Sequence, residues 1–230
     1  MNHGISAQQK ALHVSGNYTR HLSVMKISII ILISFLLCFA TNSFCQNTDL
    51  TAYKNCFDSD LKDWTNSFKD FQLSRFTLSD TIKFENLPFG DIGDLKEFYK
   101  LYEPALSFSS DNTQFLDIYS YWLNLEKKGN KVVANPEVDQ LVSLCDLKSN
   151  KWTRIFFCGL STRIDEAIWL TNTKFILAGT LLDENNEFHP KILIGDTTKQ
   201  IFIVYSDSSS VARKIGYTST KLKKLNIQDE

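Results

Sequence analysis

The spacing of apolar residues changes partway along the chain and separates two kinds of structure. Within residues 46–104, apolar side chains recur at steps of three and four, as on one face of a helix. The first such face consists of Leu61, Trp64, Phe68 and Phe71. A second helix is predicted to start at the N-cap residue Asp94 and to stop at Pro104, which cannot continue it. Residues 76–84 keep the two-residue period of a strand, either as a hairpin or as one strand interrupted near Ser79.

From residue 105 onward the helical spacing disappears, and β-branched and aromatic runs alternate with polar turns. The same order of runs occurs twice. The matching segments are 105–108 with 167–170, 112–116 with 172–176, 142–146 with 192–196, and 151–157 with 199–205. Each copy therefore predicts four strands joined in sequence, and the first copy carries about ten more residues in its middle.

Burial explains why such a unit would be repeated. One sheet cannot cover both of its faces, whereas a second sheet stacked on it buries apolar area worth about 25 cal/mol per Å². The apolar run at 201–205 is continuous, as expected for a strand covered on both faces, and Trp169 is expected in the shared core. The predicted fold is mainly β, with a small α+β N-terminal segment at 46–104 packed on the core. The β-repeat domain, 105–230, holds two tandem four-stranded antiparallel blade-like units packed face to face and ends in a short polar tail.

At these residues the sequence resembles the repeats of WD-like β-propellers, including periplasmic ones. That family's repeat often opens with a Ser-Pro-Asp-Gly-Lys turn, and the corresponding turn here is Ser109-Ser110-Asp111-Asn112. Its asparagine tolerates the left-handed backbone that glycine would supply. Asp146 and Asp196 stand where the family often has aspartate before the last hairpin turn, and both are expected to accept hydrogen bonds from their own turn.

The resemblance covers residues 105–207 and implies a protein that binds or scaffolds others. Propellers usually contain at least four blades, whereas two repeats are found here. The two units are therefore expected to pair as a sandwich whose core is closed by the N-terminal segment. Completion by a second copy of the chain is the alternative. A monomer and a dimer both fit this pattern.

The first part of the chain has the pattern of an export signal. Residues 27–40 are uncharged and mostly apolar, a length that suits the centre of a secretory signal and is shorter than the roughly 18–20 residues that cross a bilayer. The expected signal region, 1–45, divides into an upstream extension, 1–24, and a signal peptide, 25–45. We therefore expect export to the periplasm or the extracellular space, with membrane contact only before cleavage. An uncleaved anchor and a lipoprotein are the alternatives.

Charge and cysteine content narrow the possible partners. Beyond residue 45 the chain keeps 22 of its 25 basic residues and all 26 acidic ones, a net charge of −4. A mildly acidic chain lacks the basic surface of a nucleic-acid-binding protein, so no nucleic-acid partner is expected. Cys56, Cys145 and Cys158 are odd in number, which excludes a complete disulfide framework. We expect small buried thiols, with one bridge as the alternative.

Few residues in this part of the chain point to catalysis. His189 is the one histidine beyond residue 45 and is expected to be an ordinary loop residue, and no close Cys or His pair suggests zinc. No metal or cofactor is expected. The alternative is Ca²⁺ held by Asp183, Glu184 and Glu187, although their loop lacks the spacing and the glycine of a known calcium loop.

Two groups of residues are candidates for a binding site. Glycoside hydrolysis needs two carboxylates about 5–10 Å apart, and the pair at 165–166 is considered for that role beside a solvated-loop interpretation. Aromatic side chains at 119–122 could stack on sugars, although a covered strand explains them equally well. The candidate binding residues are Tyr119, Tyr121, Trp122, Asp165 and Glu166.

The sequence therefore predicts an exported, non-enzymatic, β-rich protein of the cell envelope that binds or scaffolds a protein or glycan partner. The alternatives are a carbohydrate-binding module and a carboxylate-based glycoside hydrolase.

Overall fold

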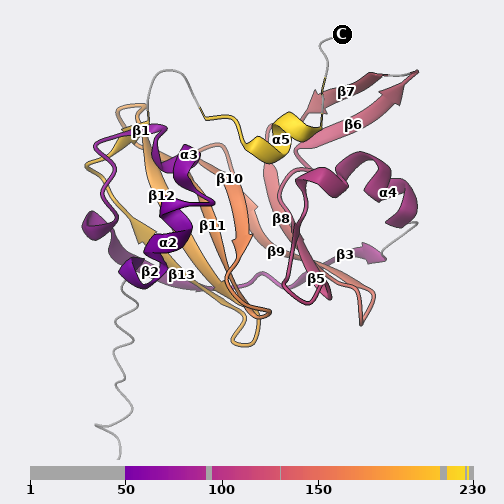
Figure 1. Cartoon of the computed structure of the whole chain (residues 1–230), viewed down its shortest axis with the longest axis horizontal. Coiled ribbons are helices and arrows are strands. Elements are labelled where there is room, and N and C mark those ends of the chain that lie inside the picture. The colour runs from indigo at the N-terminus through magenta and orange to yellow at the C-terminus, as the bar shows by residue number, and fades with distance from the viewer. Residues whose placement is uncertain (1–49, 92–94, 130, 213–216, 226, 228–230) are drawn as a thin grey trace, which may run out of the picture. The chain divides into compact units, whose positions relative to one another are not determined.

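The computed structural model describes residues 50–91, 95–129, 131–212, 217–225 and 227. These residues form a mainly β structure with short helices near both of its ends (Figure 1). The signal region expected at 1–45 lies outside them. Within the described ranges, no helix is both long enough and apolar enough to span a membrane.

The second repeat forms four consecutive antiparallel strands, to which the N-terminal segment adds a fifth. The sheet order is β10-β11-β12-β13-β2. Its strands are β10 (Thr162–Trp169), β11 (Lys174–Leu182), β12 (Phe188–Asp196), β13 (Ile201–Ser206) and β2 (Thr77–Lys83). Strand β2 is continuous and not a hairpin. Its pairing with β13 shifts between Val204 and Tyr205, so Ser79 is an extra residue and the expected interruption is a β-bulge.

The first repeat forms a matching sheet in the order β3-β9-β8-β5-β4. Its strands are β4 (Ser107–Phe108), β5 (Gln114–Asp117), β8 (Gln140–Asp146), β9 (Lys151–Cys158) and β3 (Leu87–Asp91). The additional residues of this copy form a separate hairpin, β6 (Leu123–Lys128) and β7 (Lys131–Pro136). Each repeat is therefore a four-stranded unit extended by one strand from the N-terminal segment.

The two sheets pack face to face, which confirms the fold predicted from the repeat. The ring of Phe156 on β9 lies 5.6 Å from that of Phe202 on β13. Phe84, in the connection between β2 and β3, packs on Phe202 at 4.4 Å. Leu116 and Leu193 belong to the same buried cluster. Within the described residues the sheets do not close into a barrel.

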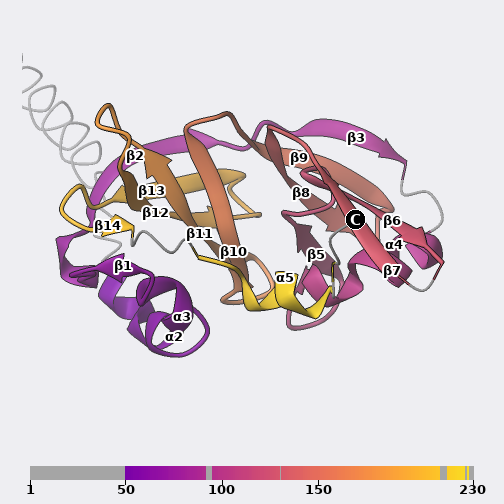
Figure 2. The ribbon, with the colours of Figure 1, turned by 90° about the horizontal axis from the view of Figure 1, so that it is seen from above.

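Helices cover the outward face of each sheet (Figure 2). The remaining elements are η1 (Leu50–Tyr53), α2 (Lys54–Asp58), α3 (Lys62–Thr65), β1 (Phe68–Lys69), η2 (Leu73–Arg75), α4 (Leu95–Tyr102), η3 (Glu103–Ala105), β14 (Val211–Ala212) and α5 (Thr220–Lys224). Helices α2 and α3 pack on the second-repeat sheet. In α4, Phe98 lies 4.8 Å from Trp152 and 6.3 Å from Phe115 of the first-repeat sheet.

Two local predictions differ from the structure. The first helical face does not form one helix, because α3 ends at Thr65 and Phe68 lies in β1. Its side chains still gather, with the Trp64 and Phe68 rings 5.0 Å apart, because burial against the sheet and not helix continuity brings them together. The expected polar tail contains α5, capped by Ser219 and followed by the buried Leu225.

Among the described residues the three cysteines are free. Cys145 lies opposite Trp152 and Cys158 lies opposite Gln140, at different levels of the β8–β9 ladder. The alternative of one bridge is therefore absent from this structure.

Candidate functional site

A β-bulge in β10 builds the centre of the candidate site. The pairing of β10 with β11 shifts between Ile164 and Glu166, so Asp165 is the extra residue. Gly179 lies opposite on β11, where a Cβ atom would stand 2.0 Å from the Arg163 carbonyl oxygen. The missing side chain allows this close approach. Bulges re-aim side chains, and here both Asp165 and Glu166 are buried.

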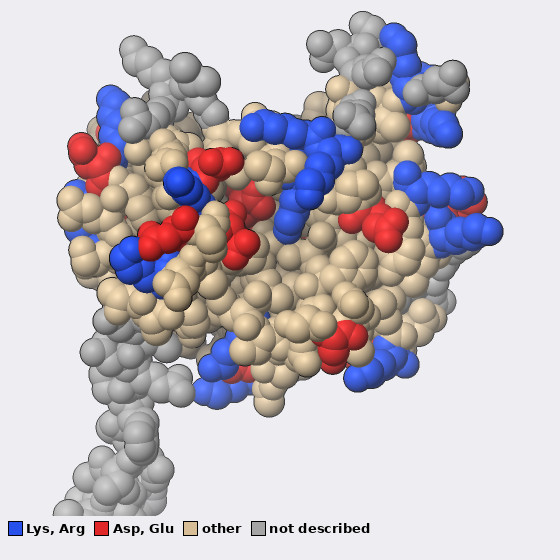
Figure 3. Space-filling view, in the orientation of Figure 1, with Lys and Arg blue, Asp and Glu red and all other residues tan. Residues whose placement is uncertain are grey.

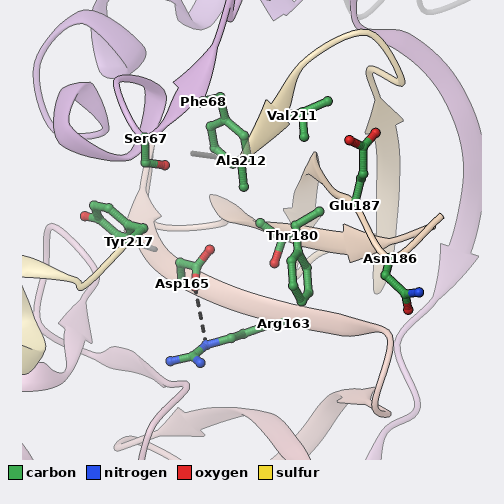
Figure 4. A pocket seen from close by; sticks show the side chains of 11 residues that line it. Ser67, Phe68, Arg163, Asp165, Thr180, Asn186, Glu187, Val211, Ala212 and Tyr217 are labelled. Atoms are coloured by element: carbon green, nitrogen blue, oxygen red, sulfur yellow. Dashed lines mark ion pairs between the residues drawn. The ribbon is translucent and has the colours of Figure 1, made fainter. Parts of the chain in front are cut away.

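Asp165 is a buried carboxylate with two partners. Its Oδ2 accepts a hydrogen bond from Trp64 Nε1 at 3.2 Å, and its Oδ1 lies 3.5 Å from Arg163 Nε (Figure 4). Burial raises the pKa of Asp165 to about 6, against the opposing effects of Arg163 and the Trp64 hydrogen bond, while Glu166 raises it further. Desolvation of the charged form is thus the dominant influence.

Asp165 faces a cavity of about 440 Å³, a volume in the range of small-molecule sites. In Figure 4, Arg163 and Asp165 lie on β10, while Glu187 and Asn186 come from the turn between β11 and β12. Aromatic and small apolar side chains complete its wall. The lining residues are Ser67, Phe68, Arg163, Asp165, Thr180, Asn186, Glu187, Phe188, Val211, Ala212 and Tyr217.

Glu166 does not line this cavity, because its own partner holds it elsewhere. Its Oε1 accepts a hydrogen bond from Tyr217 Oη at 2.7 Å. Burial and this hydrogen bond raise the pKa of Tyr217. Lys221 donates to the carbonyl of Ala167 at 2.6 Å, and burial lowers its pKa although Glu166 opposes that shift. The two carboxylates at 165–166 therefore lie in different environments, and only Asp165 lines the cavity.

Two of the three aromatic candidates contact residues of this site, and the third lies on another surface. Tyr119 is buried and donates through Oη to the carbonyl of Asp165 at 2.7 Å. The ring of Trp122 lies 4.0 Å from the Arg163 guanidinium carbon, a cation–π contact that orients the arginine. Tyr121 is exposed and lies elsewhere, where it contacts Phe89 at 6.1 Å.

The surface around Tyr121 forms a second, more open cavity of about 420 Å³. Its lining is Phe89, Ser120, Tyr121, Asn124 and Glu137. Of the five candidate binding residues, Asp165 lines the first cavity. Tyr119, Trp122 and Glu166 contact residues that line it. Tyr121 lines the second cavity.

The residues expected to have structural roles lie in turns and at the sheet interface. Asp146 Oδ1 accepts from the backbone of Lys148 and Ser149, and Asp196 Oδ1 accepts equivalently from Thr198 and Lys199. The matching bonds show that the two copies share their turn as well as their strands. Trp169 is only half-buried, and its Nε1 donates to the Ser107 carbonyl at 2.8 Å.

Charges of opposite sign flank the site. Figure 3 shows acidic side chains with basic ones among them over α2 and α3, and basic side chains over α5. Asp63 of α3 raises the pKa of Tyr217 through its charge, while Lys221, Lys223 and Lys224 lie on α5. A ligand that enters the cavity meets both signs of charge.

One further group of side chains beside the cavity could hold a metal ion. The ligand atoms of Asp183, Glu187 and His189 all lie within 4.8 Å of one another. Glu184, considered for calcium together with Asp183 and Glu187, does not belong to this group.

Sequence reasoning missed Arg163, Phe68 and Tyr217. Phe68 is far from β10 in the sequence, and Tyr217 lies beyond the last strand, so only the tertiary fold brings them together. Gly179 inside an apolar strand was the available signal, because an isolated glycine there indicates a bulge or a close backbone approach.

In comparisons with protein families, curated proteins and solved structures, nothing matches the chain. The function must therefore be argued from the geometry of the site.

Proposed function

We propose that this chain is an exported, non-enzymatic binding protein of the cell envelope and that its ligand occupies the Asp165 cavity. The observation that carries the proposal is Asp165 itself. A carboxylate inside a fold is costly to bury, and here a bulge, the opposing Gly179 and the Trp64 hydrogen bond together hold it at the wall of a cavity. Packing alone would be better served by an apolar residue.

The ligand class that the cavity fits best is carbohydrate. Planar polar side chains form its hydrogen-bonding groups, namely Arg163, Asp165, Asn186 and Glu187. Carboxylates, amides and guanidinium groups can pair with neighbouring hydroxyls, and the rings of Phe188 and Tyr217 offer apolar surface to sugar CH groups. The volume suits a ligand of one or two sugar rings in size.

Binding is favoured over hydrolysis because the two carboxylates of the 165–166 pair do not both face the cavity. Glu166, also on β10, is buried and accepts a hydrogen bond from Tyr217. A hydrolase remains the second candidate, because Asp165 has the raised pKa of a general acid and Glu187 is another carboxylate in the lining.

The test is a soluble glycan array probed with the purified chain and with two variants, Asp165→Asn and Arg163→Met. We expect at least one glycan to bind, with affinity reduced about tenfold or more in either variant. Tyr121→Ala is the matched control, since it alters the separate cavity and should leave binding unchanged. Absence of glycan binding, or loss only in the Tyr121→Ala variant, would contradict the proposal.

Hydrolysis is followed on the same glycans. Product formation by the parent chain that disappears in Asp165→Asn would show that the protein is a glycosidase and not a binding protein. Export is tested separately by sequencing the N-terminus of the secreted protein, which should begin near residue 46.

A further inference from the structure

The turn between β11 and β12 brings three different ligand-bearing side chains together. Asp183 starts the turn, Glu187 ends it, and His189 follows on β12. The side chains of Asp183 and His189 are largely buried, with 27 % and 13 % of their surface exposed. Glu187 is exposed and also lines the Asp165 cavity.

A contact from outside the turn fixes the orientation of the imidazole. His189 Nδ1 lies 2.8 Å from the carbonyl oxygen of Ser210, and a carbonyl can only accept, so Nδ1 carries a proton. In a neutral imidazole, Nε2 then presents a lone pair. That lone pair faces Asp183 Oδ2 at 3.3 Å, and the carboxylate oxygen is itself an acceptor. Two acceptors at this distance need either a proton or a metal ion between them.

This arrangement is typical of a metal-ligating histidine, whose second ring nitrogen usually donates to a backbone carbonyl or a carboxylate. Bonds of about 2.0–2.2 Å to a tetrahedral ion place neighbouring ligand atoms roughly 3.3–3.5 Å apart. The 3.3 Å separation of Asp183 Oδ2 and His189 Nε2 fits one edge of that tetrahedron.

We propose that Asp183, Glu187 and His189 bind a divalent transition-metal ion of the Zn²⁺ class. Ca²⁺ takes six to eight oxygen ligands, whereas this group includes a nitrogen, and Asp183 Oδ1 is already occupied by the backbone N–H groups of Asn185 and Glu187. Three protein ligands leave a fourth position for water or for a ligand atom. The site does not depend on the proposed carbohydrate ligand.

The competing explanation is a protonated imidazole paired with Asp183 without any metal. Calorimetric titration of Zn²⁺ into the chain, after dialysis against EDTA, separates the two. A Cys56→Ser background removes the partly exposed thiol as a competing ligand. We expect one Zn²⁺ per chain at this site, bound at least tenfold more weakly after His189→Ala or Glu187→Gln.

Glu184→Gln is the matched control, because it removes an acid from the same turn without changing the three ligands. The affinity of this variant for Zn²⁺ should equal that of the parent. Thermal unfolding in EDTA checks that each variant folds. Because Glu187 is exposed, Glu187→Gln leaves the packing of the core unchanged. Co²⁺ should give the visible absorption of a four-coordinate ion. No stoichiometric Zn²⁺ binding, or binding indifferent to both ligand substitutions, would overturn the site and leave an ion pair alone.

Discussion

Replacing Asp165 with asparagine should change the stability of the protein in a pH-dependent way. Compared with the parent chain at the same pH, the variant should gain stability as the pH rises from 4 to 8. The pKa of Asp165 is raised from an ordinary value of 3.8 to about 6, mainly by burial. The folded state therefore holds the proton more tightly than the unfolded state does. The resulting contribution to stability is fully present below the unfolded value and is lost as the pH rises through the folded value.

The size of the effect follows from the two pKa values. At about 1.4 kcal/mol per pKa unit the full difference is about 3 kcal/mol, and between pH 4 and pH 8 roughly 2–2.5 kcal/mol of it is lost. The side chain is 8 % exposed, so solvent screening reduces this little. Asparagine does not titrate, and its carbonyl oxygen can still accept from Trp64.

The assay is urea unfolding followed by tryptophan fluorescence, with EDTA present, at several pH values between 4 and 8. The free energy of unfolding of Asp165→Asn minus that of the parent should rise by roughly 2 kcal/mol across this range. Asp111→Asn is the control that should change little between pH 4 and pH 8, because hydrogen bonds from Ser109 and Thr113 lower the pKa of exposed Asp111 below its ordinary value of 3.8, so its contribution is lost only at lower pH. A difference that stays constant with pH, or one that falls, would refute the assignment of a desolvated carboxylate at Asp165.

Three further predictions test the packing of the two sheets and of α3. Gly179→Ala should destabilise the fold by about 3 kcal/mol or more, because the new Cβ atom meets the backbone of β10. Gly195→Ala should cost roughly 1–3 kcal/mol, because there the obstacle is the movable ring of Phe175. Chemical denaturation measures both losses. Trp64→Ala should cost about 3–5 kcal/mol in the same assay, since its ring is completely buried, and a loss below about 1 kcal/mol would show that α3 is not anchored there. In native thiol labelling, Cys56 should react well before Cys145, whose pKa burial raises to about 12; equal rates would contradict the burial of Cys145.

The repeat could be predicted from the sequence because its signals are local. Strand alternation, polar turns and the matching Asp146 and Asp196 each depend on a few neighbouring residues. The left-handed turn residue Asn112, with φ 54°, shows the same local logic. The two additional strands were harder to predict, because an isolated strand such as β2 does not encode which sheet edge it joins.

The site was only partly predictable, because its parts are distant in the sequence. The pair at 165–166 was identified by composition, but its burial results from a bulge that depends on Gly179 across the sheet. Trp64 reaches Asp165 from 101 positions away, a contact that no periodic pattern shows. Tyr121 shares a sequence cluster with Tyr119 and yet lines another cavity, because both lie in the turn between β5 and β6, where the two-residue alternation of a strand does not hold.

The most direct test of the central claim, that ligand binds at Asp165, is chemical-shift mapping of the isotope-labelled chain with a glycan that binds on the array. The largest backbone shifts should surround Arg163, Asp165 and Glu187, and at a subsaturating glycan concentration they should be much smaller in Asp165→Asn. Shifts centred on Phe89 and Tyr121, with the bulge of β10 unaffected, would place the ligand in the other cavity and contradict the account.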